Sequence, residues 1–191
     1  KKRKAERTSK NVDTMWDETP INITQEENFI WSIANKLRGS YMPDKYGDVI
    51  IPMTVIRRFE CALKKTKPAV VAQYKANPSF PPKALCRISR FPFYCTSEYD
   101  LAELCNEPDL IAGNFKSYVN GFSQNVREIL DQLEITKHID KMEKDGCLYT
   151  VVKAFSELDL SIETFERHSM GYIFENLNGL FYQHFYACHV F

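Results

Sequence analysis

Positively charged side chains concentrate between Arg57 and Arg90, where nine charges are positive and only Glu60 is negative. Four of these cations form two pairs seven residues apart, about two helical turns, namely Arg57 and Arg58, and Lys64 and Lys65. On one helix they would form a cationic strip, and such a strip can contact the phosphates of DNA. It can equally be a solvated helix face, and charge alone leaves both interpretations open.

The sequence contains no pattern typical of a self-contained active site. Its seven glycines never occur as G-x-G, which argues against a phosphate or dinucleotide loop, and neither G-x-S-x-G nor H-E-x-x-H is present. Six cysteines include no C-x-x-C pair, and the four histidines never stand near two of them at zinc-ligand spacing. We therefore predict reduced thiols, and no catalytic, cofactor-binding or metal-binding residue.

Apolar residues recur at helical spacing through most of the chain, and no alternating strands stand between turn residues. The predicted helices run from 24 to a stop at Gly39, then over 44–65, 68–75, 97–105, 110–119, 124–133, 135–145 and 148–158. Pro52 is expected to kink the second helix or to restart it, and Gly146 to stop the seventh. The predicted fold is all-α, a compact helical bundle with irregular connecting loops.

An aromatic segment at 91–95 interrupts this pattern. We expect a loop that its rings pin into the core, the alternative being a platform on which bases stack.

The overall composition and the first twenty residues indicate a soluble protein with a basic N-terminal arm. The 191 residues are 44% hydrophobic and 26% charged, which is typical of soluble globular proteins. No run of 18 apolar residues occurs, so we expect no membrane partner and a cytoplasmic location. Residues 1–20 are basic at the start and poor in apolar residues, which indicates a flexible solvated arm, with a nuclear address or a phosphate contact as the alternatives.

Four stretches together resemble one family: FIWSIANKLRGSYMPDKYGDVIIPMTVIRRFE at 29–60, LCRISRFPFYCTSEYDLAEL at 85–104, NFKSYVNGFSQNVREIL at 114–130 and DLSIETFERHSMGYIFENL at 159–177. They are similar, in the same order, to the N-terminal helical domain of the modification (M) subunit of type I restriction-modification systems. The resemblance divides the chain into the arm at 1–20, this helical domain at 21–177, and an atypical aromatic tail at 178–191.

The resemblance implies an adenine-specific DNA methyltransferase as the parent subunit, with S-adenosylmethionine as its cofactor. The family's catalytic domain carries a Gly-containing cofactor loop and an [N/D]-P-P-[F/Y] motif, and neither is present here. N-P-S-F-P-P at 77–82 does not match, because Ser79 interrupts it. We therefore expect the catalytic domain to be absent and this chain alone to be inactive.

The partners that the resemblance implies are DNA, a specificity subunit, a restriction subunit and a second M subunit. A rigid helical domain could help to hold the duplex while the target adenine leaves the stack. The alternative is a helical protein–protein interaction module with no role on DNA.

The turn N-G-F-S at 120–123 is a family feature by this resemblance. We expect Asn120, Gly121 and Ser123 to fix the angle between two helices, with direct contact to DNA as the alternative. Gly121 would supply a positive φ, and the Ser123 side chain would cap the helix that follows.

Overall fold

The computed structural model describes residues 23–161, with side chains from Phe29 onward. Its helices are α1 (Ile23–Leu37), α2 (Tyr46–Leu63), α3 (Lys67–Ala76), α4 (Pro82–Ser89), α5 (Leu101–Leu104), α6 (Ile111–Asn120), α7 (Gln124–Gln132), α8 (Ile135–Lys144) and α9 (Leu148–Glu157), with short 3-10 turns η1 (Pro43–Lys45) and η2 (Pro108–Leu110). Residues 23–161 contain no strand, which confirms the predicted all-α class. The predicted arm at 1–20 and tail at 178–191 lie outside the described residues.

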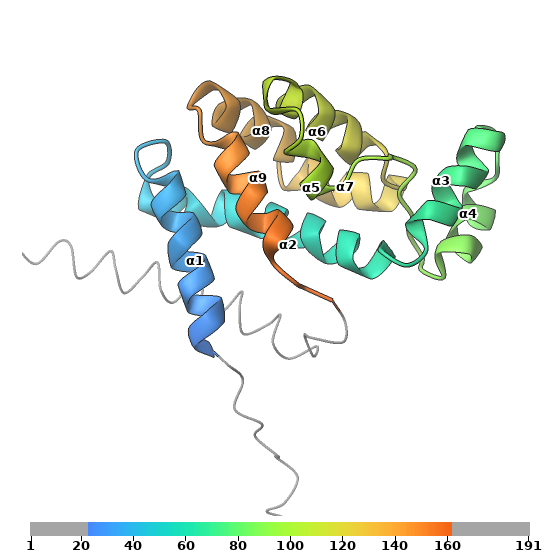
Figure 1. Cartoon of the computed structure of the whole chain (residues 1–191), viewed down its shortest axis with the longest axis horizontal. Coiled ribbons are helices and arrows are strands. Elements are labelled where there is room, and N and C mark those ends of the chain that lie inside the picture. The colour runs from blue at the N-terminus through green and yellow to red at the C-terminus, as the bar shows by residue number, and fades with distance from the viewer. Residues whose placement is uncertain (1–22, 162–191) are drawn as a thin grey trace, which may run out of the picture.

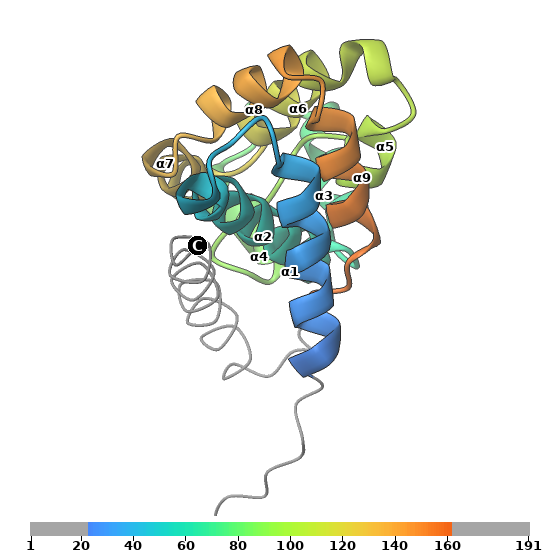
Figure 2. The same ribbon diagram turned by 90° about the vertical axis from the view of Figure 1, so that its left-hand side faces the viewer.

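Helices α2 and α9 lie at the centre of the bundle, where they pack against each other and against α1 and α8. Figures 1 and 2 show it beneath α5, α6, α8 and α9, with α1 at the end of the bundle opposite α3 and α4. Its side chains Met53 and Ile56 are fully buried, as are Phe115 of α6 and Phe155 of α9. These residues belong to one continuous apolar core, so burial of α2 on several sides holds the bundle together.

The chain breaks at glycine as predicted, but it does not break at Pro52. Gly39 and Gly146 have φ angles of 91° and 73°, in the left-handed region that favours glycine after a helix. Pro52 lies inside α2, which continues from Tyr46 to Leu63 and neither ends nor restarts there. Core residues on both sides of Pro52, such as Ile50 and Met53, hold the helix in one piece.

Two short helices differ from the prediction. The helix expected to start at Ser97 starts at Leu101, because Asp100 caps it: Asp100 Oδ1 accepts from the backbone N–H of Glu103 at 2.8 Å, and Glu103 Oε2 accepts from that of Asp100 at 2.9 Å. Helix α4 was not predicted. It begins at Pro82, and proline is favoured at the first helical position because no N–H is needed there.

Helices α3 and α4 form a hairpin that projects from one end of the bundle (Figure 1). Each helix buries one apolar residue, Val70 in α3 and Leu85 in α4, and neither belongs to the main core. The rest of the hairpin is largely exposed, so its side chains are available to a partner.

Candidate nucleic-acid interface

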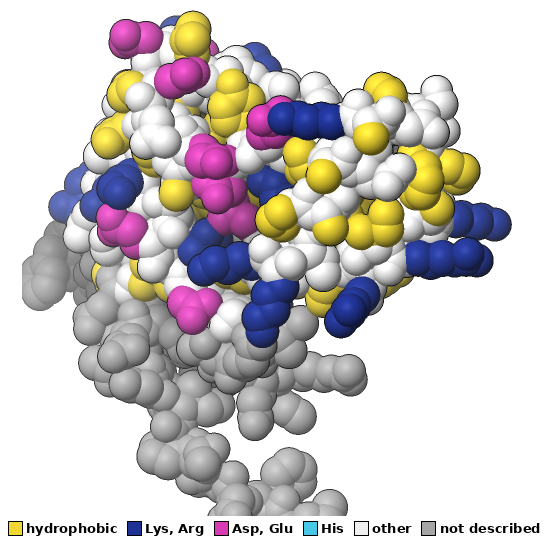
Figure 3. All heavy atoms as spheres, turned by 45° about the vertical axis from the view of Figure 1, so that its right-hand side comes forward, with side chains coloured by type: hydrophobic (Ala, Val, Ile, Leu, Met, Phe, Trp, Pro, Cys, Tyr) yellow, Lys and Arg dark blue, Asp and Glu magenta, His cyan; other side chains and the backbone are white. Residues whose placement is uncertain are grey.

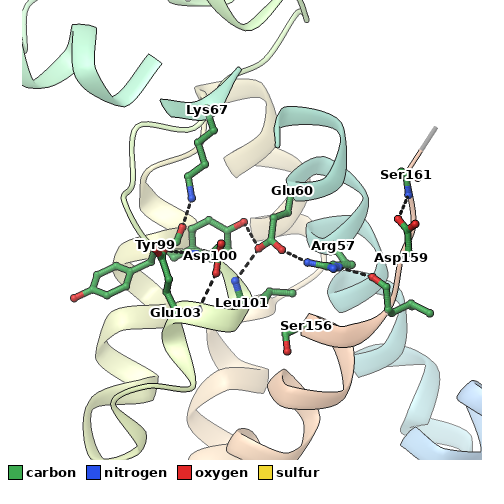
Figure 4. A network of polar contacts seen from close by, with 12 residues as sticks. Arg57, Glu60, Lys67, Tyr99, Asp100, Leu101, Glu103, Ser156, Asp159 and Ser161 are labelled. Carbon is green, nitrogen blue, oxygen red and sulfur yellow. Dashed lines mark hydrogen bonds and ion pairs between the residues drawn. The ribbon is translucent and has the colours of Figure 1, made fainter. Parts of the chain in front are cut away.

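The two arginines of the predicted strip are bound within the domain. The Arg57 side chain is only 16% exposed, its Nε donates to the Leu158 carbonyl at 2.6 Å, and its Nη1 pairs with Glu60 (Figure 4). Arg58 Nη1 donates to the carbonyl of Leu160. Both guanidinium groups therefore fasten the segment after α9 onto α2.

The two lysines of the strip lie elsewhere. Helix α2 ends at Leu63, so Lys64 and Lys65 occupy the turn that leads into α3, and both are exposed. The structure thus divides the predicted strip into a part-buried arginine pair on α2 and an exposed lysine pair beyond its end.

A buried carboxylate at the centre of the domain, Glu60, was missed as a site residue. It is 8% exposed, and its Oε2 accepts from the Leu101 backbone N–H at 2.8 Å and from the Tyr118 hydroxyl at 2.9 Å (Figure 4). With Arg57 on Oε1, this one side chain joins α2, α5 and α6. The sequence did mark it, as the single acid in a basic stretch and three residues after Arg57.

Tyr118 and Lys67 complete this polar centre. Burial, and then the negative charge of Glu60, raise the pKa of Tyr118 well above its ordinary value, so the phenol stays protonated and donates to Glu60. Lys67 Nζ donates to the Tyr99 carbonyl and lies 5.2 Å from the centre of the Tyr118 ring. Because Tyr118 is 1% exposed and Glu60 bonds to Arg57, Leu101 and Tyr118, the centre is a structural connection between α2, α5 and α6.

The N-G-F-S turn is the place where a distant loop docks. The Gly121 carbonyl accepts from the Thr96 backbone N–H at 2.8 Å, and the Ser123 N–H donates to the Tyr94 carbonyl at 2.9 Å. The predicted positive φ at Gly121 is wrong, since its φ is −73°. Glycine is needed there for space, because a Cβ would lie 2.6 Å from Cβ and 2.8 Å from N of Ser97.

The other two turn residues also differ from a simple turn. Ser123 stands at the N-cap of α7, but its hydroxyl donates to Asn125 Oδ1 at 2.7 Å and accepts from the Tyr94 N–H at 3.3 Å. The predicted side-chain cap is therefore wrong: the hydroxyl bonds to the loop at Tyr94 and to the Asn125 side chain, and not to a backbone N–H of α7. Asn120 is exposed as the last residue of α6.

The aromatic segment is pinned by its rings, as predicted. The Phe93 ring lies 4.7 Å from that of Phe59 on α2 and 5.2 Å from that of Phe91, between centroids, and all three pack against the core. Ser89 Oγ reaches the Phe93 carbonyl at 2.7 Å and secures the start of the loop.

Other places that could hold a ligand offer little chemistry. A surface pocket of about 370 Å³ between α1 and α9 is lined by Phe29 and Lys36 and by an ion pair, Lys153 to Glu157 at 3.2 Å. No group of His, Cys, Asp and Glu within residues 23–161 could hold a metal ion. The five described cysteines form no disulfide, and burial raises the pKa of Cys95 to about 11.

Within residues 23–161, no helix is long and apolar enough to cross a bilayer.

Residues 23–161 form a helical domain with a buried polar centre and an exposed basic end. Comparison with protein families matches residues 27–155 to the HsdM N-terminal domain, which is the N-terminal domain of a type I restriction-modification methyltransferase subunit. The chain belongs to this family. Neither the curated proteins nor the solved structures gave a match.

Proposed function

We propose that this domain helps a type I DNA adenine methyltransferase subunit to clamp its DNA and to assemble with its partners. Family membership over residues 27–155 is the observation that carries the proposal. The subunit would act in the cytoplasm with a specificity subunit, a restriction subunit and a second copy of itself. Methyl transfer from S-adenosylmethionine would belong to a separate catalytic domain, and residues 21–177 would form the helical domain, followed by a distinct tail at 178–191.

Among the four cationic candidates, we assign phosphate contact first to Lys64 and Lys65. They are exposed in a turn at the surface, where a flexible ammonium group can reach a phosphate. Arg57 and Arg58 already bond to the carbonyls of Leu158 and Leu160, so their main contribution to DNA binding would be to keep α2 in place. For Asn120, Gly121 and Ser123 we propose the structural role, because the loop that contains Tyr94 and Thr96 docks on this turn.

The experiment is a salt titration of DNA binding by the assembled enzyme carrying Lys64→Ala/Lys65→Ala, on specific and unrelated duplexes. Each lost phosphate contact should lower the slope of log affinity against log salt by about 1, and equally on both duplexes. Lys137→Ala/Lys144→Ala on α8 is the matched control, with the same change in charge far from the turn.

An unchanged slope on both duplexes would remove Lys64 and Lys65 from the interface. A loss confined to the specific duplex would mean that the domain reads bases or DNA shape. If the chain binds partner subunits normally and never contributes to DNA affinity, the competing function, a pure protein-interaction module, is correct.

A further inference from the structure

The α3–α4 hairpin carries cations without a single acidic neighbour in its own sequence. Residues 61–97 include no Asp or Glu and seven basic residues: Lys64, Lys65, Lys67, Lys75, Lys83, Arg87 and Arg90. Lys67 bonds to the Tyr99 carbonyl, and Lys75 pairs with Glu98 at 2.5 Å. Figure 3 shows Lys and Arg side chains projecting from the edges of the hairpin end, while the visible Asp and Glu side chains lie nearer the bundle.

Three of these cations lie on or next to α4. Lys83 and Arg87 are four residues apart on one face of the helix, and Arg90 is the residue that directly follows the helix as its C-cap. The buried residues of α4, Leu85 and Ser89, fall on the opposite face. Seven residues of helix rise about 10 Å, which is long enough to follow successive phosphates of one DNA strand, about 3.4 Å apart along the duplex axis.

These three cations are exposed and form no hydrogen bond or ion pair with any part of the chain that the structure describes. Four exposed lysines on α6, α8 and α9 are paired instead, namely Lys116 with Asp140, Lys137 with Glu134, Lys141 with Asp145, and Lys153 with Glu157, although Lys144 at the end of α8 is not. The charge on this face of α4 is therefore not neutralised within residues 23–161, and a bound polyanion could neutralise it.

Arg90 adds an independent observation. Its φ of 62° places it in the left-handed region at the end of α4, where glycine or asparagine is usual and a larger residue is strained. The other described residue of this kind, Glu134, at least pairs with Lys137. The Arg90 side chain makes no such contact that could offset the strain. This points to a role of the side chain in binding a partner outside the domain.

We propose that Lys83, Arg87 and Arg90 form a phosphate-binding face of the α3–α4 hairpin, which lies along the backbone of duplex DNA. This proposal rests on the proposed function and extends it, because it adds a second basic element beyond Lys64 and Lys65. The hairpin reads no bases: the three side chains neutralise phosphates and hold the duplex against the projecting end of the domain.

The test measures the affinity of the full chain for a short duplex of arbitrary sequence, at several salt concentrations, for Lys83→Gln/Arg87→Gln/Arg90→Asn. Asparagine tolerates the left-handed conformation, so the variant removes three charges and leaves the backbone unstrained. The expected result is a slope of log affinity against log salt lower by about 3, one for each contact. The matched control, Lys116→Gln/Lys137→Gln/Lys144→Gln on α6 and α8, should keep the original slope.

A single variant, Arg90→Gly, separates binding from folding. Glycine relieves the backbone at position 90, so the thermal midpoint should stay the same or rise while DNA affinity falls. A fall in both would mean that Arg90 acts through the fold, and it would overturn the role given to this residue.

The remaining outcomes distinguish the two proposals. If the hairpin variant binds like the unmodified chain while Lys64→Gln/Lys65→Gln loses affinity, the hairpin face is overturned and the proposed function stands. If the unmodified chain does not bind duplex DNA even at low salt, the hairpin face is overturned, and the salt titration of the assembled enzyme alone decides the proposed function. Competition by polyglutamate as effective as by DNA would reassign the face to an acidic protein.

Discussion

The Cβ atom of Ser97 lies 2.6 Å from the position that a Cβ atom on Gly121 would occupy. We therefore expect Gly121→Ala to destabilise the domain by about 1–3 kcal/mol, because the 94–97 segment must move away and weaken the Thr96 N–H bond to the Gly121 carbonyl. Chemical denaturation of both proteins measures this difference.

Gly113→Ala is the control for that substitution. Gly113 lies inside α6, and a Cβ atom added there would meet nothing within 4 Å, so alanine should stabilise the helix by roughly 0.5–1 kcal/mol. Equal effects of the two substitutions would show that helix propensity, and not contact with Ser97, governs position 121.

Replacement of Glu60 by glutamine should destabilise the domain strongly. The glutamine amide has one acceptor oxygen in place of two, so it cannot accept from Arg57, the Leu101 N–H and the Tyr118 hydroxyl together. The Arg57 charge would also lose its part-buried partner. Breaking a buried pair of this kind typically costs about 3–5 kcal/mol. Glu98→Gln, which breaks the exposed pair with Lys75, should cost less than about 1 kcal/mol, and similar losses for both would contradict the central role of Glu60.

Acid should weaken the domain through His138. Burial lowers its pKa below the ordinary 6.5, against the opposing charges of Asp48 and Glu134, and its Nδ1 lies 3.4 Å from the Tyr41 hydroxyl. The unfolded chain then binds a proton at a higher pH than the folded one, so stability is full above pH 6.5 and falls as pH drops through the folded-state pKa. Thermal midpoints of the unmodified chain and of His138→Asn, measured from about pH 8 to 5, should diverge below about 6.5. Parallel curves would exclude this histidine as the cause.

Helices with a regular apolar period were predictable because the period is local. The helices α1, α2, α3, α6, α7, α8 and α9 fall where the spacing placed them. Helix α4 was missed because two prolines before it suggested a break, although the second begins the helix. The start of α5 was missed because Asp100 and Glu103 cap it and Ser97 does not.

The candidate interface was less predictable because it depends on contacts between distant parts of the chain. Arg57 and Arg58 resemble Lys64 and Lys65 in sequence, yet the carbonyls that bind the arginines lie 101 and 102 residues away. Gly121 could be recognised as special, but its reason is a neighbour 24 residues earlier in the sequence, which no local pattern contains.

The contacts of Arg57 and Arg58 with the carbonyls of Leu158 and Leu160 have a mechanical consequence. The segment that follows α9, residues 158–160, is fixed to α2 by these hydrogen bonds and does not act as a hinge. If α2 tilted, for instance when the domain closes on a duplex, these hydrogen bonds would make Leu160 move with it. The position of Leu160 is therefore coupled to the orientation of α2.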